Sequence, residues 1–185
     1  MATKTYVIDG YGQIELNNCA FRRDGRIEAQ CALDATDFAS VPAENGMLLA
    51  IDNVTRTVAF PEAAGTLPIG LNYSAEHIYD ERTPGLKNFK LERGEFYPRL
   101  GLLAVGDKFT TNCLSYDDGD FANDAALETA LGAISTTPVY GGICPDTGRI
   151  KLQDSAPSAG PVLKVIKFTT MPDGQPAVKL QVLSV

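Results

Sequence analysis

The 185-residue sequence contains no tryptophan, a single histidine and no long apolar run. A membrane helix needs about 20 consecutive apolar residues, so the sequence predicts no membrane span. The N-terminal segment MATKTYVIDGYG also lacks the apolar stretch and the small-residue cleavage site of a secretory signal. These absences favour a chain that is made and folded in the cytosol.

Positive charge is scarce. The chain has 16 Lys and Arg residues against 23 Asp and Glu, which gives a net charge of −7 at pH 7, and no basic cluster exceeds Arg22-Arg23. A nucleic-acid groove needs clustered Lys and Arg to replace counterions. The composition therefore argues against a nucleic-acid partner, and we interpret the negative charge as a contribution to solubility.

The four cysteines include no Cys-x-x-Cys pair, which argues against a zinc site. In a reducing cytosol we expect the four cysteines to act as small, buried apolar residues. Cys19 and Cys31 flank the turn at Asp24-Gly25. A two-residue loop there pairs Cys19 with Gln30, whereas a three-residue loop places the two cysteines opposite each other, close enough for a strained disulfide. We favour free thiols.

Motifs for catalysis and cofactor binding are missing too. The sequence contains no Gly-x-Ser-x-Gly elbow, no phosphate-binding Gly-x-x-x-x-Gly-Lys-Ser/Thr loop and no Gly-x-Gly-x-x-Gly. His77, beside Tyr79, Asp80 and Glu81, is the one candidate general base, but a hydrolase also needs a nucleophile and an orienting group around it. We interpret His77 as a polar loop residue and predict no catalytic residue and no cofactor.

The most acidic stretch, YDDGDFAND at 116–124, offers the oxygen ligands that calcium prefers. Its spacing does not fit an EF-hand, because Gly119 occupies the third position and Glu128 falls in a predicted helix. We predict no metal site. Instead we expect a solvated loop in which Asn123 or Asp124 caps the helix that follows.

Turn residues and strand formers dominate what the sequence does contain. There are 17 Gly and 11 Pro, and Val, Ile, Thr, Tyr and Phe are spread along the whole chain. The 44% of apolar residues argues against disorder. The length fits one β-rich domain over 1–185, with N-terminal hairpins in 1–70, a central stretch at 71–116 and a C-terminal hairpin at 161–185.

Apolar runs separated by turn sequences predict five hairpins, 13–21 with 27–33, 47–51 with 55–60, 96–105 with 109–114, 136–143 with 149–152, and 162–170 with 177–185. The arms of the second alternate imperfectly, which indicates burial on both faces. Residues 3–9 and 69–74 are further strand candidates. Residues 76–90 read as an irregular excursion with at most one helical turn, because Thr83-Pro84-Gly85 breaks a helix.

One short, alanine-rich helix is predicted over about 124–134, with Leu127, Leu131 and Ile134 on one face. Together with the hairpins it places the fold in the mainly-β class. We expect a hairpin-rich β-barrel or sandwich.

A family resemblance rests on Asn72-Tyr73-Ser74, His77-Ile78-Tyr79-Asp80, Leu86-Lys87-Asn88-Phe89, Gly94-Glu95-Phe96, Pro98-Arg99-Leu100, Gly106-Asp107-Lys108-Phe109-Thr110-Thr111-Asn112 and the ending 164–175. These segments resemble small virion proteins of tailed bacteriophages that are encoded near the major capsid protein and decorate or cement the head. The similarity covers about 45 central residues and about 20 at the end.

The resemblance implies a non-enzymatic structural protein at the capsid surface of a virion. It implies the major capsid protein as the partner and a homo-oligomer, with a trimer favoured. None of the similar motifs is catalytic, so no functional residue is carried over individually.

We hypothesise that the central hairpin and the 76–90 segment form a docking or subunit-contact surface, an apolar patch rimmed by cations. The residues predicted for it are Tyr79, Arg82, Lys87, Phe89, Lys90, Arg93 and Phe96. Alanine at Phe89 or Phe96 is expected to weaken assembly more than folding.

Two other classes of function remain open. One is a tail or baseplate component or a carbohydrate-binding β module, in which an exposed aromatic trough is formed by Tyr73, Tyr79, Phe89, Phe96, Tyr97 and Tyr116. The other is a small hydrolase, which requires His77 within hydrogen-bond reach of a carboxylate and of a Ser or Cys.

Overall fold

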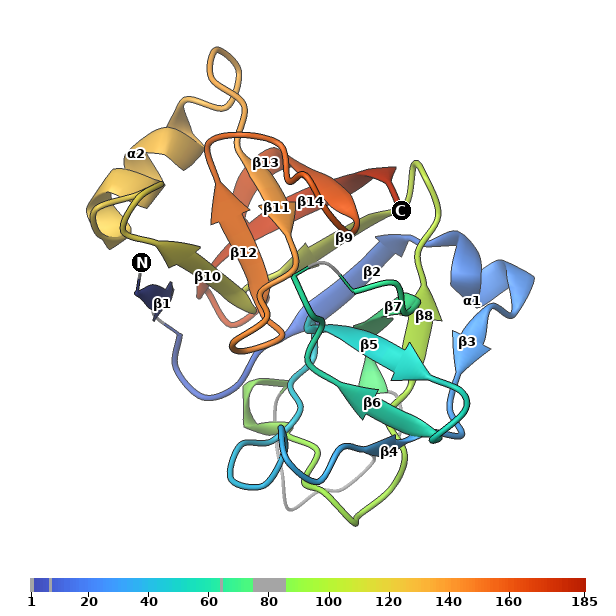
Figure 1. Cartoon of the computed structure of the whole chain (residues 1–185). Helices are drawn as coiled ribbons and strands as arrows, with labels where there is room; N and C mark the ends of the chain where they lie inside the picture. Colours follow the sequence, from blue (N-terminus) through green and yellow to red (C-terminus); the bar gives the residue numbers. More distant parts are fainter. Residues whose placement is uncertain (1, 7, 64, 75–85) are drawn as a thin grey trace.

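The computed structural model of the protein describes residues 2–6, 8–63, 65–74 and 86–185 and contains two β-sheets with few helices (Figure 1). The mainly-β prediction is confirmed. In this part of the chain the strands form two separate sheets rather than a closed barrel, which agrees with the sandwich alternative.

The larger sheet has eight strands. In spatial order they are β1 (Thr3–Thr5), β10 (Leu114–Asp117), β12 (Ile150–Gln153), β11 (Tyr140–Gly142), β13 (Val162–Thr170), β14 (Pro176–Ser184), β9 (Lys108–Thr111) and β2 (Ile14–Asn18). Neighbouring strands are antiparallel except β10 and β12, which are parallel.

The smaller sheet has six strands. Their spatial order is β3 (Ile27–Glu28), β8 (Leu100–Leu102), β7 (Ile69–Asn72), β5 (Leu48–Asp52), β6 (Thr57–Ala59) and β4 (Ala32–Leu33). Only β4 and β6 run parallel, and β4 is a terminal strand of this sheet.

Helix α2 (Asp124–Gly132) confirms the predicted short helix. Its N-cap is Asn123, whose side-chain oxygen accepts a hydrogen bond from the Ala126 N–H at 2.9 Å. The Tyr6 hydroxyl donates to Glu128 at 2.8 Å and the Tyr116 hydroxyl donates to Asp124 at 2.6 Å. These two bonds hold the helix against the larger sheet.

Three predicted hairpins are confirmed, namely β5 with β6, β11 with β12, and β13 with β14. In each of them the turn connects adjacent strands of one sheet, so a local pattern of apolar residues and turn residues was sufficient to predict the hairpin. The strand candidates at 3–9 and 69–74 appear as β1 and β7. A 3₁₀ turn, η2 (Leu86–Asn88), lies in the predicted excursion, of which residues 75–85 are outside the described part.

The hairpin predicted for 13–21 and 27–33 is wrong. β2 is a terminal strand of the larger sheet and β3 belongs to the smaller one, and between them the chain forms a short helix, α1 (Ala20–Asp24), that ends at Gly25 with φ +71°. The Phe21 ring of this helix packs where a Cβ at Gly101 would be. Cys19 and Cys31 therefore lie in different apolar clusters, and all four cysteines are buried and free.

The central hairpin predicted for 96–114 is also wrong. β8 lies in the smaller sheet and β9 in the larger, so the Gly106-Asp107 turn carries the chain from one sheet to the other. The buried Asp107 carboxylate accepts hydrogen bonds from the Ala20 N–H at 2.7 Å and the Ala104 N–H at 2.9 Å. These bonds fix the crossing against the start of α1.

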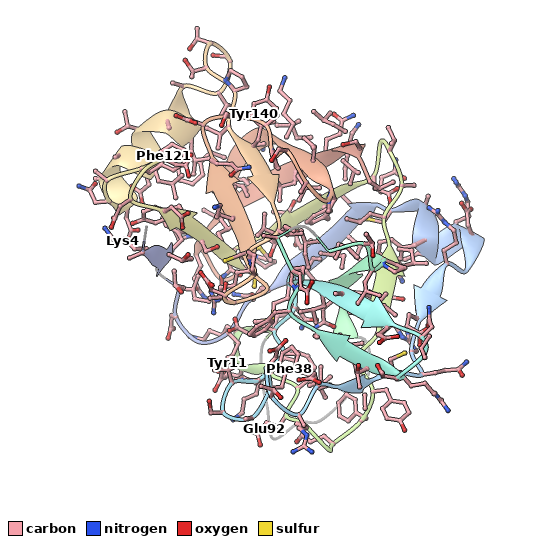
Figure 2. The ribbon with its side chains drawn as sticks, viewed as in Figure 1. Lys4, Tyr11, Phe38, Glu92, Phe121 and Tyr140 are labelled. Atoms are coloured by element: carbon pink, nitrogen blue, oxygen red, sulfur yellow. The ribbon has the colours of Figure 1, made fainter. Side chains whose placement is uncertain are left out.

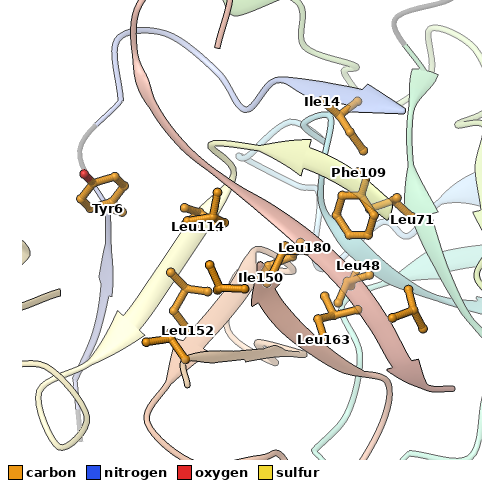
Figure 3. Close-up of a cluster of buried hydrophobic side chains, with 14 of the residues drawn as sticks. Tyr6, Ile14, Leu48, Leu71, Phe109, Leu114, Ile150, Leu152, Leu163 and Leu180 are labelled. Carbon is orange, nitrogen blue, oxygen red and sulfur yellow. The ribbon is translucent and has the colours of Figure 1, made fainter. Parts of the chain in front are cut away.

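Two apolar clusters form the core. The larger contains residues of both sheets and of α2, and Figure 3 shows its side chains converging from several strands. The smaller lies against the smaller sheet. On β5, Leu48 joins the larger cluster and Leu49 and Ile51 join the smaller, so this strand is buried on both faces as its imperfect alternation predicted.

Candidate functional site

The predicted interaction surface is described only in part. Tyr79 and Arg82, as well as His77, lie outside the described residues. One segment, which leads from η2 to β8, contains the other five predicted residues, Lys87, Phe89, Lys90, Arg93 and Phe96. Their side chains point in different directions.

Phe89 belongs to the core and not to the surface. Its side chain is 3% exposed and lies in the smaller apolar cluster. The reason is a short bridge between the backbones of Leu91 and Ala43, whose two N–H···O bonds are both 2.9 Å long and draw this segment against the protein body. The expectation that Phe89→Ala weakens assembly more than folding is therefore corrected, because this change would open a cavity in the core.

The two lysines of the segment each have an acidic partner. Lys87 forms an ion pair with Asp9, and that hydrogen bond raises the pKa of Lys87. Lys90 pairs with Glu92 and also lies over the Tyr11 ring, 5.7 Å from its centroid. The predicted cations are present, but these two are locally neutralised, so the rim is less positive than the sequence indicated.

Lys90 and Arg93 border a hollow of about 400 Å³, which we call the Tyr11 hollow. It is lined by Tyr11, Phe38, Ala39, Ser40, Val41, Pro42, Lys90, Glu92 and Arg93. Figure 2 shows Tyr11, Phe38 and Glu92 together at one end of the molecule. Phe38 is buried in the smaller cluster, so Tyr11 is the ring that this hollow offers for stacking, next to charged groups of both signs that can form hydrogen bonds with a polar ligand.

Phe96 and Tyr97 form an exposed aromatic pair, with exposed fractions of 42% and 53%. They follow a turn in which the Glu92 N–H donates to the Glu95 carboxylate at 2.9 Å and Gly94 has φ +88°. The pair borders a small hollow with Ala32 and Leu33 of the terminal strand β4. Exposed aromatic rings next to a strand at the edge of a sheet are suited to protein contact.

A buried ion pair, which the sequence analysis missed, joins the segments that lead into the two sheets. Arg149 Nη2 lies 2.6 Å from Glu44 Oε1 and 2.7 Å from Oε2, and both residues are buried. The Gly12 N–H donates to Glu44 Oε2 at 2.6 Å. Glu44 precedes β5 and Arg149 precedes β12, 105 residues further along the chain, so no local pattern could have paired them.

Cys113 lies beside this ion pair but is not activated by it. Burial, and secondarily the charge of Glu44, raise the pKa of the Cys113 thiol well above its usual range. The neutral thiol is a poor nucleophile. We therefore interpret the Glu44–Arg149 pair as a structural contact in the protein interior.

The acidic stretch holds its carboxylates with local partners. Asp117 accepts hydrogen bonds from Lys151 Nζ at 2.9 Å and from Thr3 Oγ1 at 3.0 Å, and Lys4 pairs with Asp118. Burial, and next the bond to Asp124, raise the pKa of Tyr116 to about 12. Within residues 2–6, 8–63, 65–74 and 86–185, no three His, Cys, Asp or Glu side chains come together as a metal site.

No helix in the described part of the chain is both long and apolar enough to cross a membrane. Comparison with known proteins adds no assignment, since no family model, no curated protein and no solved structure matches this chain.

Proposed function

We propose that this chain is a non-enzymatic structural protein of a tailed-phage virion that binds the major capsid protein at the capsid surface and stabilises the capsid lattice. The proposal includes self-association of the chain, with a trimer favoured. It extends the resemblance of the central and C-terminal segments to head decoration proteins.

The observation that supports this role best is the exposed aromatic pair beside β4. Phe96 lies within one of the segments that resemble decoration proteins, and Tyr97 follows it directly. Large aromatic side chains dominate the binding energy of protein interfaces when a partner buries them. A terminal strand next to them provides backbone groups for pairing with a strand of the partner.

The test is co-sedimentation of the purified chain with phage heads that are assembled from the major capsid protein of the same virion and lack this chain. The wild type is expected to bind. Replacing both rings, Phe96→Ala with Tyr97→Ala, is expected to weaken binding about 30-fold or more, since truncated interface anchors cost about 2 kcal/mol or more. Thermal melting should change less than it would for a core ring such as Phe89, because Phe96 and Tyr97 are about half exposed whereas Phe89 is buried.

The matched control is Val54→Ala, which truncates another exposed apolar residue, at the tip of the β5–β6 hairpin. It is expected to bind heads like the wild type. Absence of wild-type binding would refute the proposed function. Full binding by the double aromatic variant would refute the surface but leave the function standing.

The Tyr11 hollow favours a second candidate, a carbohydrate-binding module. Sugars stack on aromatic rings and accept hydrogen bonds from Lys and Arg, and this hollow offers Tyr11 next to Lys90 and Arg93. A glycan array is the test. Specific glycan binding that Tyr11→Ala abolishes, without any binding to heads, would favour this candidate over the capsid role.

A further inference from the structure

Half of the chain's lysines lie on the outer face of the larger sheet. The register of β13, β14 and β9 aligns Lys164 with Gln181 and Gln181 with Lys108, and it places Lys167 directly opposite Lys179. Their strand neighbours Leu163, Phe109 and Leu180 are buried in the core. Because successive side chains of a strand alternate between faces, the four lysines point away from the core. We call Lys108, Lys164, Lys167 and Lys179 the lysine face.

The lysine face is unusual for a chain with a net charge of −7. No ion pair joins any of the four lysines to a described residue of the chain. Among the residues that the register aligns with them, only Glu15 is acidic, and Thr110 separates it from Lys179. Like charges placed directly opposite in a sheet, such as Lys167 and Lys179, destabilise the isolated sheet.

The opposite charge accumulates further along the same sheet. Thr3 Oγ1 lies within 3.0 Å of Asp117 and 2.9 Å of Asp146, which brings these two carboxylates together. Burial, and then the nearby charges of Asp154 and Asp117, raise the pKa of Asp120. We call Asp117, Asp118, Asp120, Asp146 and Asp154 the acidic end; Lys4 and Lys151 are the cations that pair with it.

We propose that the lysine face of one copy binds the acidic end of a second copy. The lysine face places like charges beside one another within a monomer, and the acidic end carries five carboxylates against the two cations that pair with it, so one contact between copies brings the excess charges of opposite sign together. Exposed Ile166 and Leu183 on the same hairpin add the apolar contact typical of protein interfaces. A nucleic acid is a poorer fit, because this face has no arginine and the net charge is negative.

This contact deepens the proposed function and rests on the self-association that it includes. Its test is nevertheless independent of capsid binding. If the chain binds heads but does not self-associate, the contact fails and the capsid role stands. If it self-associates but does not bind heads, the capsid role fails and the contact between copies stands.

The test is sedimentation velocity of the full chain over a range of concentrations, at about 50 mM and about 500 mM salt. We expect an oligomer at low salt. Its dissociation constant should be at least tenfold higher at high salt, because salt screens the attraction between exposed charges beyond a few ångströms. Lys167→Glu with Lys179→Glu should be monomeric. The matched control, Arg22→Glu with Arg23→Glu on α1, changes the net charge equally and should still associate.

A charge exchange tests which regions meet. Asp118→Lys with Asp120→Lys should also be monomeric alone. Mixing it with the Lys167→Glu, Lys179→Glu variant should restore association, because each reversed region then meets a complementary one. Circular dichroism verifies that both variants fold. The proposal is overturned if the wild type stays monomeric at low salt, if the Lys167→Glu, Lys179→Glu variant still forms the oligomer, or if the mixture remains monomeric. It is also overturned if the lysine face binds duplex DNA in place of a second copy.

Discussion

The buried Glu44–Arg149 pair is the residue-scale contact on which stability should depend most. Arg149→Met would leave the Glu44 carboxylate buried with one N–H donor, from Gly12. Removing one partner of a buried ion pair costs about 3–5 kcal/mol, because the remaining charge is desolvated without compensation. We expect that loss in the free energy of unfolding measured by urea denaturation.

Arg23→Met serves as the control, since the Arg23 side chain is 78% exposed and forms an ion pair with its neighbour Asp24. Exposed pairs contribute about 0–1 kcal/mol, so this variant should be close to the wild type. A loss below about 1 kcal/mol for Arg149→Met would mean that water replaces the guanidinium.

The Asp117–Lys151 pair predicts a pH dependence. Burial alone would raise the pKa of Asp117, but hydrogen bonds from Lys151 and Thr3 outweigh it and hold this pKa below 3.8. A lowered carboxyl pKa stabilises the fold above pH 3.8, and that contribution is lost as the pH falls through the folded value. The bond to Asp117 raises the pKa of Lys151 above 10.5, so its contribution is lost only in strong alkali.

Asp117→Asn should therefore lower the free energy of unfolding by about 1 kcal/mol at pH 7. In strong acid, below the folded pKa of Asp117, the variant and the wild type should converge, since both side chains are then neutral. Urea midpoints at the two pH values provide the measurement. If Asp117→Asn lowered the free energy of unfolding equally at both pH values, the effect would come from altered geometry and not from the lost charge.

At the scale of elements, the sequence predicted what is local. The hairpins β5–β6, β11–β12 and β13–β14 and helix α2 each depend on turn residues, caps and periodicity within a short stretch. The two wrong hairpins have equally good turn sequences, Asp24-Gly25 and Gly106-Asp107. At both places the neighbouring strands belong to different sheets, and contacts distant in sequence decide that.

The site shows the same division. The sequence placed Phe96 and Arg93 in an exposed segment, and the structure gives them exposed or hollow-lining positions. It could not reveal that Phe89 turns inward, because the bridge between Leu91 and Ala43 joins segments far apart in the chain. It also could not pair Lys87 with Asp9 across 78 positions.

The packing of α1 on β8 gives an element-scale prediction. A methyl group at Gly101 would collide with the Phe21 ring, whereas one at Gly132 of α2 would meet nothing within 4 Å. Gly101→Ala should cost about 1–3 kcal/mol by overpacking. Gly132→Ala should stabilise by up to about 1 kcal/mol, because alanine loses less backbone entropy in a helix. Thermal unfolding of both variants is the measurement, and equal melting temperatures would contradict the Phe21 contact.

At the scale of the whole molecule, the chain passes from the larger sheet to the smaller and back again. It enters the larger sheet at β1 and β2, continues through the smaller sheet from β3 to β8, and returns at β9. The larger cluster contains Leu48 and Leu71 of the smaller sheet beside Leu114 and Leu180 of the larger. Neither sheet can therefore lose its packing without exposing apolar surface of the other.

This interdependence predicts a single cooperative unfolding transition. Because the chain has no tryptophan, one introduced indole reports on one place. Phe60→Trp would report on the smaller cluster and Phe168→Trp on the larger, since each ring is partly buried against it. Within each variant, the fluorescence transition in guanidinium chloride and the far-ultraviolet circular dichroism transition should share one midpoint, as two-state behaviour requires. Separate midpoints for indole and backbone signals would instead show that each sheet unfolds on its own, and the shared cluster and the Glu44–Arg149 pair would then not couple them.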